Sequence, residues 1–162
     1  MPFLKLKGEM RVMDIKIGEK TYKLEYNFEA ALYEDCVTAL YKIVTKSADG
    51  NLNQDSAEIL KSIAGQPNTV ATLFYAGLME CNPVADITVA KGLLKQYFIE
   101  NKGNKEANFY GIYKIINKQM EDDCFFDLIG LSAVIAEMTE NAEKLVKKQA
   151  QDHKPKKSTS QK

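Results

Sequence analysis

The sequence predicts an α+β fold that is mostly α, with an N-terminal β-hairpin followed by a multi-helix bundle. Apolar and polar residues alternate near the start of the chain, and apolar residues recur at helical spacing over most of the rest. The 162 residues, 45% of them hydrophobic, are enough for one core. We expect a single globular domain over residues 1–148 and a disordered basic tail over residues 149–162.

The hairpin is expected between residues 10 and 26. Gly18-Glu19 separates two alternating runs, and glycine supplies the positive φ that a two-residue turn requires. Phe3 to Leu6 is a candidate third strand. The apolar residues of the two alternating runs are Met13, Ile15, Ile17, Tyr22, Leu24 and Tyr26.

Helices are expected from residue 28 to residue 148, separated by short breaks. Asn27 is placed to cap a long first helix that reaches Lys46, and Pro67 and Asp86 are placed to begin two later helices. Asn82-Pro83 ends the helix before Asp86, so the two helices form a helical hairpin. The other expected helical runs lie at about 55–65, 109–120 and 125–148.

The final helix has the most regular pattern. Its apolar residues alternate steps of three and four, which aligns them in one stripe. We interpret this helix as a core element of the bundle, and the alternative is that part of the stripe docks a partner helix. The stripe consists of Leu128, Leu131, Ile135, Met138, Ala142 and Leu145.

The three cysteines, Cys36, Cys81 and Cys124, are widely spaced and stand in apolar helical contexts. Neither a disulfide framework nor a metal-binding spacing fits them, so we expect small core residues in a reducing compartment. The chain shows no signal-like apolar region and no run of about 20 apolar residues, the length that crosses a membrane. We therefore expect a cytoplasmic protein that is not associated with membranes.

The sequence offers no convincing catalytic, cofactor-binding or metal-binding set. The sole histidine is His153, in the expected tail, and no phosphate-binding glycine loop follows a strand. Asp49 to Asp55 resembles the start of a calcium loop, but Gln54 and Leu60 occupy the positions of the required glycine and glutamate. We interpret these residues instead as a solvated turn rich in Asp, Asn and Gly. We therefore expect a protein that is not an enzyme.

Two acidic clusters, Glu34-Asp35 and Glu121 to Asp123, could pair as acid and base. We interpret both as carboxylates in the first turns of helices, where the helix dipole favours them. The net charge is zero and the lysines gather near the C-terminus, so nonspecific attraction to nucleic acid is the alternative use of the tail. A DNA-recognition helix at Asp86 to Tyr97 would have Lys91 and Lys95 as its basic residues. Two lysines are few basic residues for a helix that binds DNA.

The order of the expected elements resembles that of the tail assembly chaperones of long-tailed bacteriophages and prophages, especially those of Gram-positive hosts. The resemblance rests on Ile15 to Leu24 leading into Asn27-Phe28, and on Tyr75-Ala-Gly-Leu-Met-Glu-Cys-Asn-Pro83 followed by the helix at Asp86 to Val89. It spans about residues 13 to 100.

The resemblance implies a non-enzymatic protein that binds the tape measure protein and helps to recruit tail tube subunits in the host cytoplasm, and that is absent from the mature virion. Self-association would repeat such a binding surface along the client. The alternative is a small helical regulatory or nucleic-acid-associated protein that uses its basic tail. Candidate partner-binding residues are the aromatic and methionine side chains Tyr97, Tyr110, Tyr113, Phe125, Phe126 and Met138.

Overall fold

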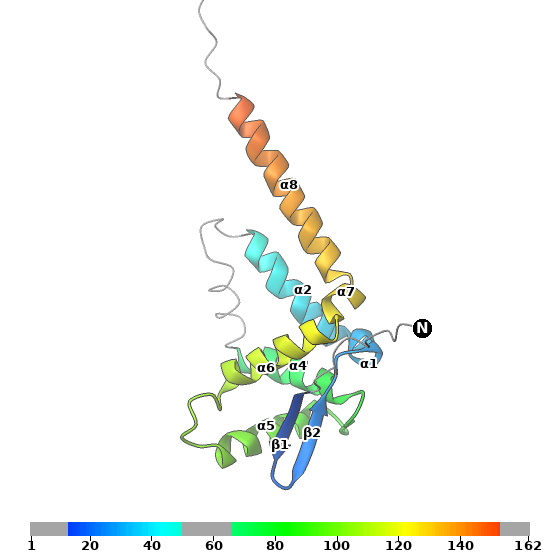
Figure 1. Ribbon diagram of the computed structural model, residues 1–162, viewed down its shortest axis with the longest axis vertical. Helices are drawn as coiled ribbons and strands as arrows, with labels where there is room; N and C mark the ends of the chain where they lie inside the picture. The colour runs from blue at the N-terminus through cyan, green and yellow to red at the C-terminus, as the bar shows by residue number, and fades with distance from the viewer. Residues whose placement is uncertain (1–12, 50–65, 153–162) are drawn as a thin grey trace, which may run out of the picture.

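The computed structural model describes residues 13–49 and 66–152. A two-stranded antiparallel hairpin packs against a group of helices, and a long C-terminal helix rises away from that body (Figure 1). The predicted α+β fold, mostly α, is confirmed. The expected strand at Phe3 to Leu6, the expected helix at 55–65, residues 50–55 of the calcium-like loop and His153 lie outside the described residues.

The hairpin consists of β1 (Met13–Ile17) and β2 (Lys20–Leu24). Ile17 pairs with Lys20 across the two-residue turn, and Gly18 has a φ of +63°, as predicted for the turn glycine. The backbone N–H of Gly18 donates to Glu100 Oε2 at 2.7 Å, which ties the turn to helix α5 (Ile87–Glu100). One face of the hairpin, formed by Ile15, Ile17, Tyr22 and Leu24, is buried.

The long first helix is divided in two, contrary to the prediction. Helix α1 covers Phe28–Leu32 and helix α2 covers Glu34–Asp49, with Tyr33 between them in an extended conformation. The Tyr33 ring packs edge-on against Tyr75 at 5.4 Å between centroids, a tertiary contact that periodicity does not reveal. Glu34 and Asp35 then lie in the first turn of a new helix, as expected for carboxylates.

Asn27 precedes α1, but its side chain accepts no capping hydrogen bond, so the predicted cap is wrong. Its amide nitrogen instead donates to Glu25 Oε1. The cap predicted at Asp86 is confirmed, because its carboxylate accepts from Val89 N–H at 3.0 Å.

Helix α4 (Pro67–Leu78) lies at the centre of the body, where it contacts α2, α5, β2 and α6 (Phe109–Asp122). Pro67 occupies the first turn, as predicted. Tyr26 is buried against this helix, and its hydroxyl donates to the Leu73 carbonyl at 2.8 Å. Together α4 and α5 form the expected helical hairpin. Fully buried side chains of α4 are Val70, Leu73, Phe74, Ala76 and Leu78.

The second acidic cluster is not in the first turn of a helix. Glu121 and Asp122 end α6, and Asp123 follows it. The Asp123 carboxylate accepts from the backbone N–H of Tyr26 and from Gln119 Nε2, each at 2.8 Å. Partial burial raises the pKa of Asp123, and these two hydrogen bonds oppose that rise. The cluster therefore fastens the end of α6 to the start of α1, which replaces the predicted helix-dipole role.

Helix α7 (Phe125–Leu128) and helix α8 (Leu131–Asp152) replace the single final helix of the prediction. Gly130, with a φ of +77°, separates them, and this separation removes Leu128 from the stripe on α8. Helix α8 continues to Asp152, past the predicted end at Lys148, because Gln149, Ala150 and Gln151 all favour helix. Residues 149–152 are therefore helical, which corrects the expected start of the disordered tail.

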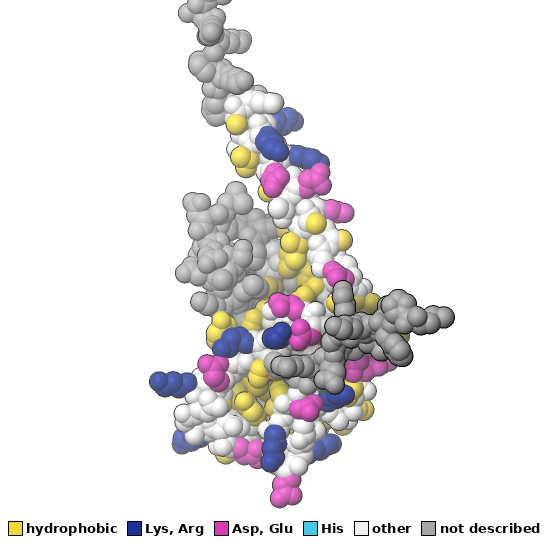
Figure 2. All heavy atoms as spheres, in the orientation of Figure 1, with side chains coloured by type: hydrophobic (Ala, Val, Ile, Leu, Met, Phe, Trp, Pro, Cys, Tyr) yellow, Lys and Arg dark blue, Asp and Glu magenta, His cyan; other side chains and the backbone are white. Residues whose placement is uncertain are grey.

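Helix α8 is not a core helix over most of its length. Leu131 is buried against α7 and α2, but the exposed fractions of Ile135 and Leu145 are 43% and 62%. Figure 2 shows hydrophobic side chains along one edge of this helix. Among residues 131–151 of α8, the first turn alone belongs to the core. The prediction that this helix is a core element is therefore wrong for the rest of its described length.

The cysteines occupy three different environments, so the prediction that all three are core residues is wrong. Cys36 is fully buried, Cys81 is half-buried in the turn after α4, and Cys124 is exposed. Burial raises the pKa of Cys36 to about 12. The hydrogen bond that the Cys81 thiol donates to Glu25 Oε2, together with partial burial, raises the pKa of Cys81 to about 11.

Thiol labelling at pH 8 is expected to rank the cysteines as Cys124, then Cys81, then Cys36. A thiol with a pKa of about 11 has a thiolate fraction of roughly 0.001 at pH 8, against about 0.25 for an ordinary pKa of 8.5, so Cys81 reacts at least about 100-fold more slowly than an ordinary thiol. Cys36 should label only on unfolding. Mass spectrometry of alkylated peptides checks the order, and native-state labelling of Cys36 as fast as that of Cys124 would contradict it.

Candidate functional site

The described parts of the chain contain neither a metal-binding cluster nor an unpaired buried polar side chain. Within residues 13–49 and 66–152 no group of three or more His, Cys, Asp or Glu side chains is placed to hold a metal ion. The same residues leave no buried side-chain nitrogen or oxygen without a hydrogen-bond partner. None of the described helices is both long enough and apolar enough to cross a membrane. The same residues form two apolar surfaces.

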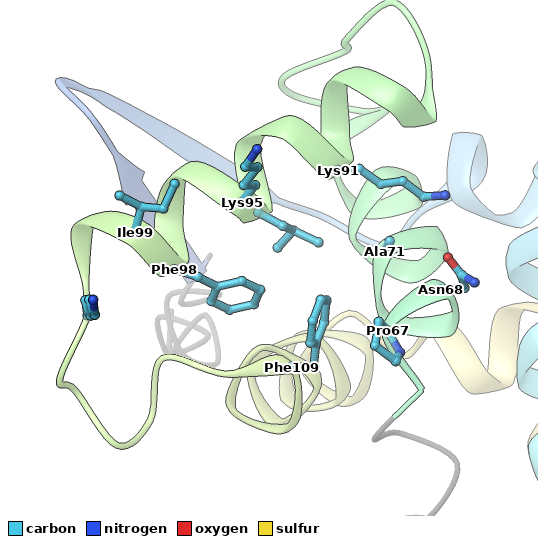
Figure 3. Close-up of a pocket in the computed structure, with 10 residues that line it drawn as sticks. Pro67, Asn68, Ala71, Lys91, Lys95, Phe98, Ile99 and Phe109 are labelled. Carbon is cyan, nitrogen blue, oxygen red and sulfur yellow. The ribbon is translucent and has the colours of Figure 1, made fainter.

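One apolar surface is a cleft of about 610 Å³ formed by α4, α5 and the start of α6 (Figure 3). We call it the lysine-rimmed cleft. Its volume lies within the range of about 300–1,000 Å³ that is usual for binding pockets. The residues that line it are Pro67, Asn68, Ala71, Lys91, Leu94, Lys95, Phe98, Ile99, Lys102 and Phe109.

Two aromatic rings form the apolar interior of the cleft. Phe98 from α5 and Phe109 from α6 point toward each other, with 4.8 Å between ring centroids and an interplanar angle of 67° (Figure 3). Both rings are half-buried, and Ile99 beside them is 65% exposed. The cleft therefore presents an open aromatic surface to a ligand.

Helical periodicity places the lysines on this surface. Leu94 and Phe98 lie on the face of α5 that turns toward α4 and α6, and Lys91 and Lys95 recur with them at steps of three and four. Lys102 lies in the turn that follows α5. Figure 3 shows Lys91 extending from α5 toward α4. Lysine can lay its methylene stem on an apolar wall and keep its ammonium group in water.

The charge around the cleft is uncompensated within the described residues. The residues that line the cleft include three lysines and no carboxylate, and the salt bridges found in residues 13–49 and 66–152 involve Lys114, Lys118 and Lys144 instead. An apolar cavity with a positive rim favours a ligand that combines an apolar group with negative charge. The cleft was missed by sequence reasoning, although Lys91, Leu94, Lys95 and Phe98 are in helical phase in the sequence.

The predicted partner-binding residues do not form one surface. Phe125 is fully buried with its ring 5.7 Å from that of Tyr26, and Tyr113 is buried in α6, where burial raises its pKa. These two side chains are core residues in this structure. Tyr97, Phe126 and Met138 are half-buried on α5, α7 and α8, and Tyr110 on α6 is 38% exposed.

A second apolar surface is the α8 stripe, which we define as Ile135, Met138, Ala142, Leu145 and Val146. Ile135, Leu145 and Val146 are exposed, and Met138 and Ala142 are half-buried. Soluble proteins seldom leave a contiguous apolar face in water without a binding role. The described part of the chain thus has two solvent-accessible apolar surfaces of different character.

Comparison with known proteins does not assign this chain to a family. No family model, curated protein or solved structure matches it.

Proposed function

We propose that this chain is a non-enzymatic assembly chaperone of the phage or prophage tail type, which binds the tape measure protein in the host cytoplasm and helps to recruit tail tube subunits. The observation that supports this proposal best is the lysine-rimmed cleft. The proposal assigns the cleft to a helical segment of the client, which packs apolar side chains against Phe98 and Phe109 and places carboxylates near Lys91, Lys95 and Lys102.

The shape of the cleft supports this assignment. Recognition of an amphipathic helix usually relies on a few apolar anchors that enter a groove, with charged residues at the rim setting orientation and specificity. The half-buried Phe98 and Phe109 pair supplies such a groove, and the three lysines select acidic flanks. A long helical client with exposed apolar stripes would remain soluble while these stripes are covered.

The proposal is tested by co-expression with the tape measure protein encoded in the same genome. The client alone is expected in the insoluble fraction, and co-expression is expected to move it to the soluble fraction in a complex with this chain. The alternative regulatory role predicts instead an unchanged client and salt-dependent binding of the chain to DNA. A client that stays insoluble beside a soluble, folded chain would contradict the proposal.

A further inference from the structure

Helix α1 presents an apolar pair to solvent. Phe28 and Leu32 are four residues apart, so they lie on one face of this helix, and their exposed fractions are 61% and 64%. Ala30, on the opposite face, is buried. The two large side chains therefore point away from the core, in the arrangement by which a short amphipathic helix enters a groove on another molecule.

Three carboxylates lie around this pair. Glu29 belongs to α1 and is exposed, and the Glu80 carboxylate accepts from the backbone N–H of Glu29 at 3.4 Å. Glu25 comes shortly before α1, and every charged residue from Glu25 to Asp35 is acidic. The salt bridges found within residues 13–49 and 66–152 use none of these three carboxylates. We call Phe28, Leu32 and the three glutamates the acidic patch.

The acidic patch and the lysine-rimmed cleft have complementary chemistry. The cleft combines the apolar surface of Phe98 and Phe109 with three lysines and no carboxylate. The patch combines two exposed apolar side chains with three carboxylates. Surfaces of opposite charge attract one another and disfavour partners of like charge, and apolar anchors that enter a pocket supply most of the binding energy. The patch therefore has both features that the cleft favours in a ligand.

Within one chain the two surfaces lie at opposite ends of α6. Phe109, the first residue of α6, lines the cleft, and Asp123, which follows the last one, accepts from the backbone N–H of Tyr26 just before α1. A helix of 14 residues is about 20 Å long. Figure 1 shows α1 and the start of α6 on opposite sides of the body. The patch can therefore reach the cleft of another copy and not its own.

We propose that the acidic patch of one copy of this chain docks in the lysine-rimmed cleft of a second copy, with Phe28 and Leu32 packed against Phe98 and Phe109. The two surfaces differ, so the contact is heterologous. Each added copy brings one patch and one cleft, and the copies form a ring where the rotation closes and an open filament where it does not.

The self-contact deepens the proposed function, on which it rests for the identity of the competing ligand. The client helix and the acidic patch occupy the same cleft, so each excludes the other. The chain without client is then held as an oligomer whose clefts are covered, and client binding separates the copies. An apolar cleft that is covered in this way is protected from nonspecific association.

The self-contact is tested by sedimentation velocity of the full chain without client at low salt, over about 5–200 μM. The mean mass of the wild-type chain is expected to increase with concentration. Phe28→Lys/Leu32→Lys removes both anchors and adds repulsion from the cleft, so the dissociation constant is expected to rise at least about 100-fold. Leu145→Lys/Val146→Lys, the matched control, makes the same change at two exposed apolar residues of α8 and should leave the association intact.

A mixing experiment tests which surfaces meet. Lys91→Glu/Lys95→Glu keeps its patch and loses its cleft, whereas Phe28→Lys/Leu32→Lys keeps its cleft and loses its patch. Each variant alone is expected to be monomeric. An equimolar mixture is expected to form a heterodimer that grows no further, because one intact patch and one intact cleft remain. Circular dichroism checks that each variant keeps the helix content of the wild-type chain.

A wild-type chain that is monomeric at about 200 μM would overturn the proposal, since a cleft covered by a second copy requires association in this range. Equal losses in the patch variant and the α8 control, or a mixture that stays monomeric, would also overturn it. These outcomes are separate from failure of the proposed function, because no client is present. A monomeric chain that still solubilises the tape measure protein would refute the self-contact alone, and an oligomer that leaves this client insoluble would refute the chaperone role alone.

Discussion

Replacing Gly77 with alanine is expected to lower the free energy of unfolding by about 2–4 kcal/mol. A Cβ atom at this position would lie 2.6 Å from Tyr26 Oη and 2.7 Å from Tyr26 Cζ. The Tyr26 ring is fully buried and has no room to withdraw. The added methyl group therefore displaces the ring, and the hydrogen bond from Tyr26 to the Leu73 carbonyl is weakened or lost.

Gly92 provides the matched control for this substitution. It is also a helical glycine, in α5, but a Cβ atom there would meet no other atom within 4 Å. Gly92→Ala should raise stability by about 0.5–1 kcal/mol, because alanine favours helix over glycine. Urea unfolding monitored by circular dichroism measures both variants, and equal effects would show that the contact between Gly77 and Tyr26 is not the cause.

Charge reversal at the rim of the lysine-rimmed cleft is expected to weaken client binding about 30- to 100-fold at low salt. Lys91→Glu/Lys95→Glu replaces two attractive contacts with two repulsive ones beside an apolar surface, which corresponds to about 2–3 kcal/mol. Both side chains are exposed in the free protein, so folding should be unaffected. The effect should shrink as salt is added.

The control for this prediction is Lys42→Glu/Lys105→Glu, which makes the same change in net charge at two residues that do not line the cleft. Lys42 borders a neighbouring, more polar hollow that shares Asn68 with the cleft, and Lys105 lies in the loop before α6. Fluorescence anisotropy with labelled client segments measures the affinities. Equal losses in the two double variants would indicate general charge attraction, and no loss in either would place the client elsewhere.

The parts of the fold that depend on neighbouring residues were predictable. The Gly18 turn, the Pro67 start and the Asp86 cap each rest on the chemistry of one residue and its immediate neighbours. The break at Tyr33 was not predictable, because the apolar period of the first helix continues across Tyr33. Its packing partner, Tyr75, is remote in the sequence. Local pattern gave no sign of that contact.

The surfaces were harder to predict than the elements. The sequence pattern of an apolar stripe is the same whether the stripe faces a core or a partner. The exposure of Leu145 is decided instead by the direction in which α8 leaves the body, which the pattern does not contain. Phe125 and Tyr113 were expected as contacts because they are aromatic, and the structure buries both. The cleft is assembled by three helices, and only the phase of Lys91, Leu94 and Phe98 along α5 hinted at it.

The most direct test of the central claim is an affinity scan of overlapping segments of the tape measure protein against the wild-type chain and Lys91→Glu/Lys95→Glu. Our account predicts that the binding segments are helical, carry apolar residues flanked by aspartate or glutamate, and lose affinity in the double variant. Binding by no segment, or binding that the double variant leaves unchanged, would contradict the assignment of the lysine-rimmed cleft to a helical client.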